Sequence, residues 1–239
     1  MNRRIEDVSL RDFIQLKIIV IGDSGVGKTS FLHRYINDVF ETDTQPTINI
    51  DIMNKRLFIK NEPVQLCFHD TAGTERFAAI SNNYYKGSCA CIIMYDVTRK
   101  STFTSVERWL SKLQSILENT IPIIIIGNKT DICQEREIST EEGEKYAKTN
   151  KCYFIETSCL NGTNVNEAID IVIKNGITTN MLTTLKSSQI GVITPQKPLL
   201  ASQYASNSNT PIHVSPNSNE TNQSNKSQTK PQVQVQCCQ

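Results

Sequence analysis

Residues 22–29 read Gly-Asp-Ser-Gly-Val-Gly-Lys-Thr, and no other segment limits the possible folds of this chain so strongly. They match the pattern G-x-x-x-x-G-K-[ST] at every fixed position, between an apolar stretch of strand length and a predicted helix. Glycines there let backbone N–H groups surround phosphates, and the helix N-terminus adds its dipole. We therefore predict that Lys28 reaches the β- and γ-phosphates of a nucleotide and that Thr29 binds Mg²⁺. The alternative is a chance glycine-rich turn, which the strand-and-helix context disfavours.

A second motif selects the base. Residues 128–131 read Asn-Lys-Thr-Asp and follow a buried apolar stretch, about 100 residues after Lys28. The Asp131 carboxylate can accept hydrogen bonds from the N1–H and the 2-amino group of guanine. Adenine offers neither donor there, so it would leave the carboxylate buried and unpaired. The sequence thus predicts bound GTP or GDP and disfavours a P-loop kinase or ATPase.

Apolar, β-branched stretches alternate with helix-like stretches along the chain. The expected strands are residues 16–21, 64–69, 90–97, 122–127 and 152–157, and the expected helices are residues 101–118, 139–150 and 164–180. The helix at 139–150 begins with a capping-box pattern. Such alternation indicates βαβ units. With residues 48–59 as an antiparallel edge strand, we predict an α/β P-loop NTPase fold, a mostly parallel six-stranded sheet with helices on both faces.

Composition divides the chain into an N-terminal extension (residues 1–13), one domain (14–182) and a disordered tail (183–239). Of the 39 residues from 201 to 239, 26 are Ser, Thr, Asn, Gln or Pro. Such a segment buries too little apolar surface to offset the entropy lost on ordering.

The formal net charge of +1 gives no reason to expect a nucleic-acid partner. We expect no membrane span, no signal peptide and a reducing compartment, so the internal cysteines are interpreted as core residues rather than disulfides or zinc ligands.

These motifs together resemble the Ras superfamily of GTPases, over roughly residues 14–180. The loop at 22–29, Asp-Thr-Ala-Gly at 70–73 and Asn-Lys-Thr-Asp at 128–131 are similar to its first, third and fourth signature boxes. Glu-Thr-Ser-Cys at 156–159 is similar to the fifth. Several stretches resemble the Rab branch: residues 28–32, 70–77, 84–88 and 93–98.

The resemblance implies a role for each site residue. Thr29, Thr47 and Asp70 would hold Mg²⁺, and Lys28, Gly73 and Thr74 would form the catalytic set. Phe40 would stack across the guanine, Asn128 and Asp131 would hold it, and Lys129 would pack along its face. Backbone amides near Ser158 and Cys159 would meet the guanine O6. The predicted nucleotide site comprises Asp23, Ser24, Gly25, Val26, Gly27, Lys28, Thr29, Ser30, Phe40, Thr47, Gly73, Asn128, Lys129, Asp131, Ser158 and Cys159.

The sequence departs from the Rab pattern at a few positions. Thr74 stands where the family usually has the glutamine that orients the attacking water, and its hydroxyl is too short to span the same gap. This predicts slow intrinsic hydrolysis, or in the extreme a GTP-loaded scaffold with negligible turnover. Asn49 and His69 replace a glycine and a tryptophan on the surface that Rab partners contact, which predicts an atypical set of effectors. Cys159 and Leu160 replace Ala-Lys, which predicts somewhat weaker nucleotide binding.

The last cysteines, Cys237 and Cys238, resemble a Rab double-cysteine prenylation signal. A C-a-a-X box requires cysteine at the fourth position from the end, which is Gln236. Two lipid chains give stable anchoring where one is marginal. The resemblance implies a prenyl-transferase escort and a lipid-shielding carrier. It also implies effectors that read switch I and switch II, an exchange factor and a GTPase-activating protein. We expect a monomer on the cytoplasmic face of an endomembrane, with a cytosolic pool.

Overall fold

The computed structural model describes residues 4–40, 51–70, 84–117 and 121–190. The chain divides into two units, Met1–Thr194 and Pro195–Gln239, and every described residue belongs to the first. Thr47, Gly73, Thr74 and the two terminal cysteines lie outside the described residues. The roles predicted for them therefore stay predictions.

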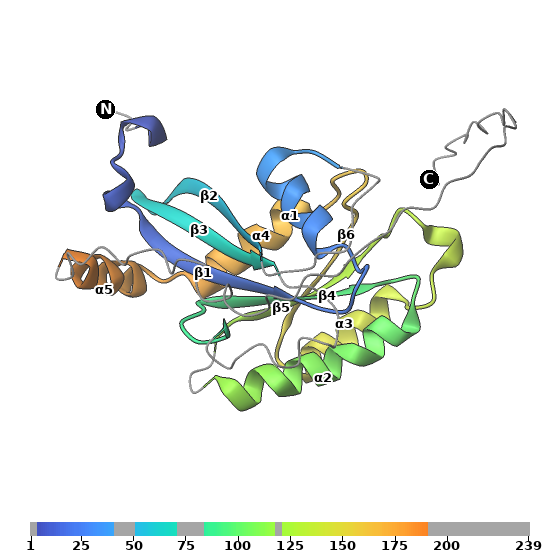
Figure 1. Cartoon of the computed structure of the whole chain (residues 1–239). Helices are drawn as coiled ribbons and strands as arrows, with labels where there is room; N and C mark the ends of the chain where they lie inside the picture. Colours follow the sequence, from blue (N-terminus) through green and yellow to red (C-terminus); the bar gives the residue numbers. More distant parts are fainter. Residues whose placement is uncertain (1–3, 41–50, 71–83, 118–120, 191–239) are drawn as a thin grey trace, which may run out of the picture. The chain divides into compact units, whose positions relative to one another are not determined.

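Six strands form one sheet in the order β2-β3-β1-β4-β5-β6 (Figure 1). Every neighbouring pair is parallel except β2–β3, which is the predicted antiparallel edge pair. The strands are β1 (Ile14–Ile21), β2 (Asp51–Ile59), β3 (Glu62–Asp70), β4 (Ala90–Asp96), β5 (Ile123–Asn128) and β6 (Tyr153–Thr157). The predicted α/β fold with a mostly parallel six-stranded sheet is confirmed.

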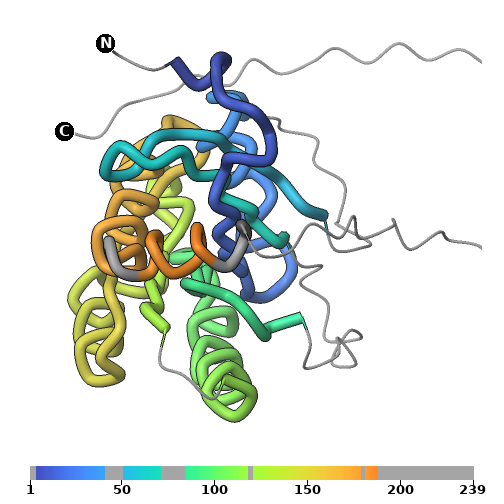
Figure 2. Tube along the Cα trace, turned by 90° about the vertical axis from the view of Figure 1, so that its left-hand side faces the viewer, coloured from blue at the N-terminus to red at the C-terminus, as the bar shows by residue number. Residues whose placement is uncertain are grey.

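Helices cover both faces of the sheet. One core lies under α1 (Lys28–Asn37), α4 (Val165–Gly176) and α5 (Thr179–Ile190), and the other under α2 (Lys100–Ile116) and α3 (Thr140–Thr149). Figure 2 shows α2 (green) and α3 (yellow) side by side on their face. Short 3₁₀ helices complete the described elements: η1 (Ile5–Asp7), η2 (Leu10–Asp12) and η5 (Cys133–Glu135).

The strand sequences are apolar because both faces of the sheet are covered. In β1, Ile18 and Val20 enter one core while Ile19 and Ile21 enter the other, as the two-residue period of a strand requires. All seven residues of β4 are buried. Burial on both faces explains the nearly continuous apolar runs on which the prediction depended.

The prediction of one last helix over residues 164–180 was wrong. Helix α4 ends at Gly176, and Ile177 has an extended backbone (φ −115°, ψ 96°) with its side chain fully buried. The Thr178 hydroxyl then accepts a hydrogen bond from the Met181 amide (3.1 Å), and Leu182 is buried in the same core. The chain turns because this places both Ile177 and Leu182 inside. Helix α5 continues past residue 182, the domain boundary that the sequence suggested.

The start of α3 agrees with the predicted capping pattern. The Ser139 hydroxyl accepts a hydrogen bond from the Glu142 amide (3.2 Å), which satisfies one N–H at the helix N-terminus.

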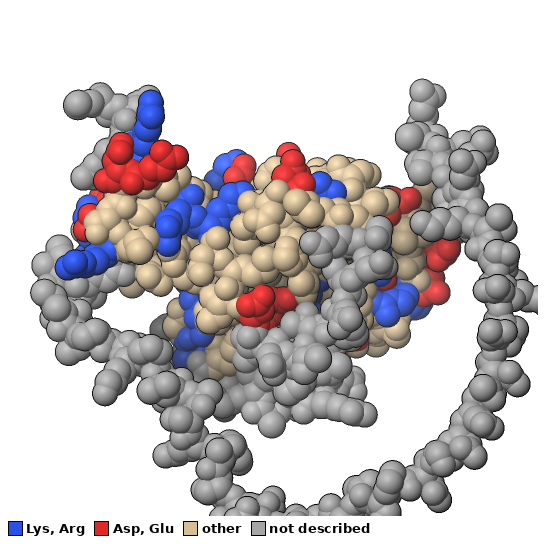
Figure 3. Space-filling view, turned by 45° about the horizontal axis from the view of Figure 1, so that its top comes forward, with Lys and Arg blue, Asp and Glu red and all other residues tan. Residues whose placement is uncertain are grey.

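Acidic and basic side chains are interspersed over the face drawn in Figure 3. Among the described residues, no helix is both long and apolar enough to cross a membrane.

Candidate functional site

The predicted site residues lie where four parallel strands end. Gly22 directly follows β1, while Asp70, Asn128 and Thr157 are the last residues of β3, β5 and β6. Because these strands are parallel in one sheet, their carboxyl ends share one edge. Ligands of α/β proteins bind at this edge.

The loop at 22–27 is shaped by glycines with positive φ. Gly22 (φ +141°) passes so close to β4 that an added Cβ would collide with the Met94 carbonyl oxygen. Gly25 (φ +74°) and Gly27 (φ +97°) make the turn into α1. Only glycine adopts these conformations without strain, so the spacing seen in the sequence has a direct backbone cause.

Lys28 is buried at the start of α1, with 5% of its surface exposed. Its ammonium donates to the Gly22 and Asp23 carbonyl oxygens at 2.8 and 2.9 Å. Burial lowers the pKa of Lys28 to about 8, against the opposing pull of Asp70 and Asp23. The loop thus holds a cation at its centre, as a phosphate site requires.

Thr29 and Asp70 form the candidate metal site. The Thr29 hydroxyl donates to Asp70 Oδ2 at 2.5 Å, and Asp70 is fully buried. Its other oxygen, Oδ1, is buried and has no hydrogen-bond partner within the described part of the chain. Burial raises the pKa of Asp70, only partly countered by Thr29 and Lys28. Mg²⁺ binds hydroxyl and carboxylate oxygens, so this pair fits that cation.

Asn128 ties the base motif to the phosphate loop. Its amide nitrogen donates to the Val26 carbonyl at 2.9 Å, and its Oδ1 accepts from the Thr157 hydroxyl at 3.1 Å. A Cβ added to Gly27 would collide with the same amide nitrogen. Asn128 and Thr157 are both buried, so these bonds form away from water. The two motifs are therefore one connected structure.

Asp131 is held by the loop that follows β6. The Ser158 hydroxyl donates to Asp131 Oδ1 at 2.5 Å. The Ser158 amide donates to the Thr163 carbonyl at 3.1 Å, so of the two amides predicted to meet guanine, that of Cys159 is the better candidate. The Cys159 thiol donates to Asn128 Oδ1 at 3.3 Å.

Lys129 and Phe40 flank this region. Lys129 has a positive φ (+72°), and its ammonium lies 2.8 Å from Asp96 Oδ2. Phe40 is half-buried, with the Arg34 guanidinium 6.0 Å from its ring centre. Arg34 also donates to the Cys159 carbonyl at 2.9 Å, which links α1 to the base loop.

Sequence reasoning missed several residues that support the loop. Asp23 Oδ1 accepts hydrogen bonds from the Trp109 indole (2.9 Å) and from Arg108 (3.2 Å), both on α2. Asp96 and Arg99 also contact this region from the end of β4 and the start of α2. One signal was present for Asp96: a carboxylate that ends an otherwise fully apolar strand.

His69 precedes Asp70 at the end of β3, and its surroundings decide between a structural residue and a general base. Its ring packs edge-on against Tyr84, with 5.7 Å between ring centres, and the Tyr84 hydroxyl donates to its carbonyl at 2.8 Å. Burial, together with Lys17, lowers the pKa of His69, which favours the neutral ring. This packing agrees with the structural interpretation.

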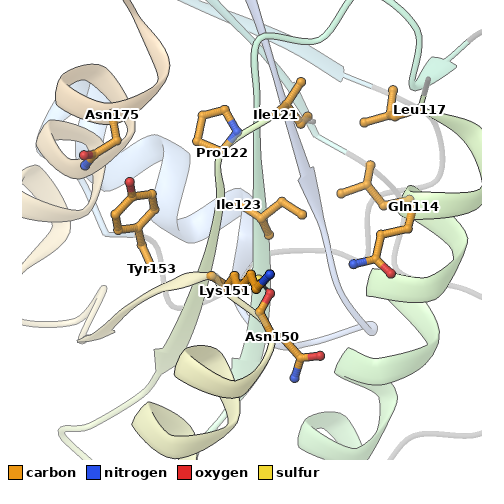
Figure 4. Close-up of a pocket in the computed structure, with 11 residues that line it drawn as sticks. Gln114, Leu117, Ile121, Pro122, Ile123, Asn150, Lys151, Tyr153 and Asn175 are labelled. Atoms are coloured by element: carbon orange, nitrogen blue, oxygen red, sulfur yellow. Dashed lines mark hydrogen bonds between the residues drawn. The ribbon is translucent and has the colours of Figure 1, made fainter. Parts of the chain in front are cut away.

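A separate pocket of about 580 Å³ lies at the other end of the sheet (Figure 4). It is lined by Leu113 near the C-terminal end of α2, by Leu117 just after that helix, and by Ile123 and Tyr153 at the amino ends of β5 and β6. Since the candidate nucleotide residues occupy the carboxyl ends, this pocket is no part of their site.

Comparison with known proteins identifies the family. Residues 17–178 match the model of the Ras family. The chain is 42% identical over 154 residues to Ras-related protein Rab-11C of Dictyostelium discoideum, covering 64% of this chain and 69% of that protein. It is 38% identical over 186 residues to human Ras-related protein Rab-25, covering 73% and 87%. It is 40% identical over 152 residues to Ras-related protein RABA6b of Arabidopsis thaliana, covering 64% and 66%. The chain therefore belongs to the Ras family and is a Rab-type small GTPase, an enzyme that binds guanine nucleotide and hydrolyses GTP.

Proposed function

We propose that this GTPase is a membrane-attached, nucleotide-timed switch in vesicle traffic, which recruits effectors in its GTP form. One observation supports this above all others. Lys28 and the Thr29–Asp70 pair lie at the same sheet edge as Asn128 and Asp131, so a single guanine nucleotide can engage both groups. In its GTP state, Thr47 and Gly73 would meet the γ-phosphate and order the switch I and switch II loops, which are released after hydrolysis.

Different residues bind the phosphates, the Mg²⁺ ion and the guanine base. Lys28 holds the β- and γ-phosphates, and the amides of Ser24–Ser30 surround them. Thr29, Thr47 and Asp70 hold Mg²⁺, which when bound neutralises phosphate charge. Asp131 and Asn128 hold guanine, with Phe40 and Lys129 on its faces. Lys28 keeps its proton when it contacts the phosphates, because their negative charge offsets the burial that lowers its pKa.

Thr74 sets the speed of the switch. Its short hydroxyl does not hold the attacking water where the usual glutamine would, so hydrolysis by the free protein is slow. An activating protein that supplies an arginine, or a glutamine in trans, then controls turnover, by roughly 10³–10⁵-fold in the examples known. The second candidate function, a GTP-loaded membrane scaffold, is favoured by the same residue.

Membrane attachment is proposed from Cys237 and Cys238, which resemble a Rab double-cysteine prenylation signal. Geranylgeranyl groups on these two cysteines anchor the protein to an endomembrane. An escort presents the protein to the prenyl-transferase, and a carrier shields the lipids in the cytosol. An exchange factor and an activating protein set the nucleotide state.

The nucleotide content of freshly purified, unlipidated full-length protein tests the proposal. Extraction and chromatography should yield mostly GDP if the protein cycles as a switch. Mostly GTP would favour the scaffold. Folded protein that holds no guanine nucleotide would contradict both.

Single-turnover hydrolysis then tests Thr74. Thr74→Gln should hydrolyse bound GTP at least tenfold faster than the wild type, since a water-positioning side chain is restored. Thr74→Ala serves as the matched control and should resemble the wild type. Equal rates in all three proteins would show that residue 74 does not determine the rate of GTP hydrolysis.

A further inference from the structure

The outer side of the phosphate loop carries a cation that the family motifs do not include. Arg99 is the N-cap residue of α2, and its Nη2 donates to the Ser24 carbonyl oxygen at 3.2 Å. A Cβ added to Gly25 would lie only 3.4 Å from the same nitrogen. The guanidinium therefore packs directly against the bare backbone of the Ser24–Gly25 peptide, with 44% of its side chain exposed.

A buried carboxylate fixes the direction of this guanidinium. Arg99 Nε lies 3.0 Å from Oδ2 of Asp96, whose side chain is 1% exposed. Burial alone would raise the pKa of Asp96, but hydrogen bonds from Lys129 and Thr98 outweigh it and the pKa is lowered. Asp96 is therefore a carboxylate at neutral pH. Its bond to Nε leaves the Nη2 amino group to reach Ser24.

The Ser24 carbonyl and the Gly25 N–H belong to one peptide unit. A charged donor on the carbonyl polarises the unit, which makes its N–H a stronger donor, because hydrogen bonds in a chain reinforce one another. It also fixes the plane of a peptide whose glycine is otherwise free to rotate. Both effects act on an N–H of the loop assigned to the phosphates.

We propose that Arg99 is a positioning residue for the nucleotide phosphates, acting through the Ser24–Gly25 peptide. This rests on the proposed phosphate role of the loop. Arg99 supports the contact made by GDP and by GTP alike, so it lengthens the residence of both and leaves the chemical step unchanged.

Dissociation of GDP and of a slowly hydrolysed GTP analogue tests this, measured on full-length, unlipidated protein with Mg²⁺ in excess. Arg99→Met should accelerate both dissociations, each by roughly five- to tenfold, as expected for one charge-assisted hydrogen bond. Arg99→Lys keeps the charge but loses the fork, so it should fall between. Single-turnover GTP hydrolysis should change less than about twofold. The adjacent, exposed Lys100 provides the matched control as Lys100→Met, which removes the same charge without touching the loop.

A second readout separates this role from a general loosening of the site through Asp96 and Lys129. IDP lacks the 2-amino group, so the ratio of GDP to IDP affinity reports on base recognition alone. Arg99→Met should leave that ratio unchanged. A lowered ratio, or dissociation rates within about twofold of those of Lys100→Met, would overturn the inference. If Arg99→Met does not fold, the same comparison is decided by Arg99→Lys, whose dissociation would then have to exceed that of Lys100→Met. Wild-type protein that binds no GDP would instead contradict the proposed function itself.

Discussion

The base side of the site, at the ends of β5 and β6, pairs its buried polar groups with one another, whereas the phosphate side, at the ends of β1 and β3, retains buried charge. On the base side, Asn128 bonds to Val26, Thr157 and Cys159, and Ser158 bonds to Asp131. On the phosphate side, Lys28 has a depressed pKa and Asp70 a raised one. Both are ionisable groups that burial pushes toward neutrality.

This difference indicates what each side depends on. A network of satisfied hydrogen bonds is held by the fold, so it can recognise a base without first rearranging. Buried charge is costly by itself and becomes favourable when opposite charge arrives. We therefore expect base-side changes to alter which nucleotide binds, and phosphate-side changes to alter how binding responds to pH.

The largest effect expected is a change of base preference. Asp131→Asn replaces a double acceptor with a group that presents a donor to guanine, while its remaining oxygen can still accept from Ser158. GDP affinity should fall on the order of 10³-fold, because donors of the base are left unpaired. XDP, which carries a carbonyl in place of the 2-amino group, should bind to the variant more tightly than it binds to the wild type. Titration with both nucleotides measures this, and equal GDP affinity in the two proteins would remove Asp131 from the base side.

The next prediction concerns the junction between the two sides. Gly27→Ala combines a positive φ with a Cβ that meets the Asn128 amide, so it should lower the free energy of unfolding by about 2–4 kcal/mol. Gly87 provides the control, since its φ is +72° but a Cβ there meets nothing within 4 Å. Gly87→Ala should cost about 1 kcal/mol, from the backbone alone. Equal losses of unfolding free energy in the two variants, measured with urea, would mean that a Cβ at position 27 fits beside the Asn128 amide without cost.

The sequence predicted the base side and the phosphate loop because each is a local motif at the end of an apolar strand. The strands were predictable for the same reason, being buried on both faces. The break at Ile177 was not, because the apolar residues on either side of this buried turn keep the spacing of one longer helix. The role of Arg99 was not, because its contact with Ser24 depends on how α2 packs, which no single stretch encodes.

The pH response should show that the phosphate side holds a titrating cation. Bound phosphates favour protonated Lys28 and raise its pKa above the value of about 8 that burial gives it. Binding is then strongest below that value and weakens above it, where the lysine must first take up a proton. GDP affinity should fall roughly fourfold between about pH 7 and about pH 8.5.

Lys28→Arg supplies the control for that titration. Its guanidinium stays charged throughout this range, so its affinity should be weaker but flat with pH. A wild-type profile as flat as that of the variant would show that Lys28 is already charged without the nucleotide. The depressed pKa of Lys28 would then no longer distinguish the phosphate side from the base side.

The smallest effect should come from Cys159, although it lies in the middle of the base side. Its thiol is a weak donor, and burial raises its pKa to about 12, so it stays neutral. In Cys159→Ala, Asn128 Oδ1 still accepts from Thr157, so unfolding should cost about 0.5 kcal/mol and GDP dissociation should change less than about twofold. Thr157→Val removes the stronger donor and should cost about 1–1.5 kcal/mol. A larger loss for Cys159→Ala than for Thr157→Val would place the thiol, rather than the hydroxyl, at the centre of the network. If Thr157→Val costs more stability than Cys159→Ala, as expected, then Cys159 contributes to guanine binding through its backbone amide, which alanine retains.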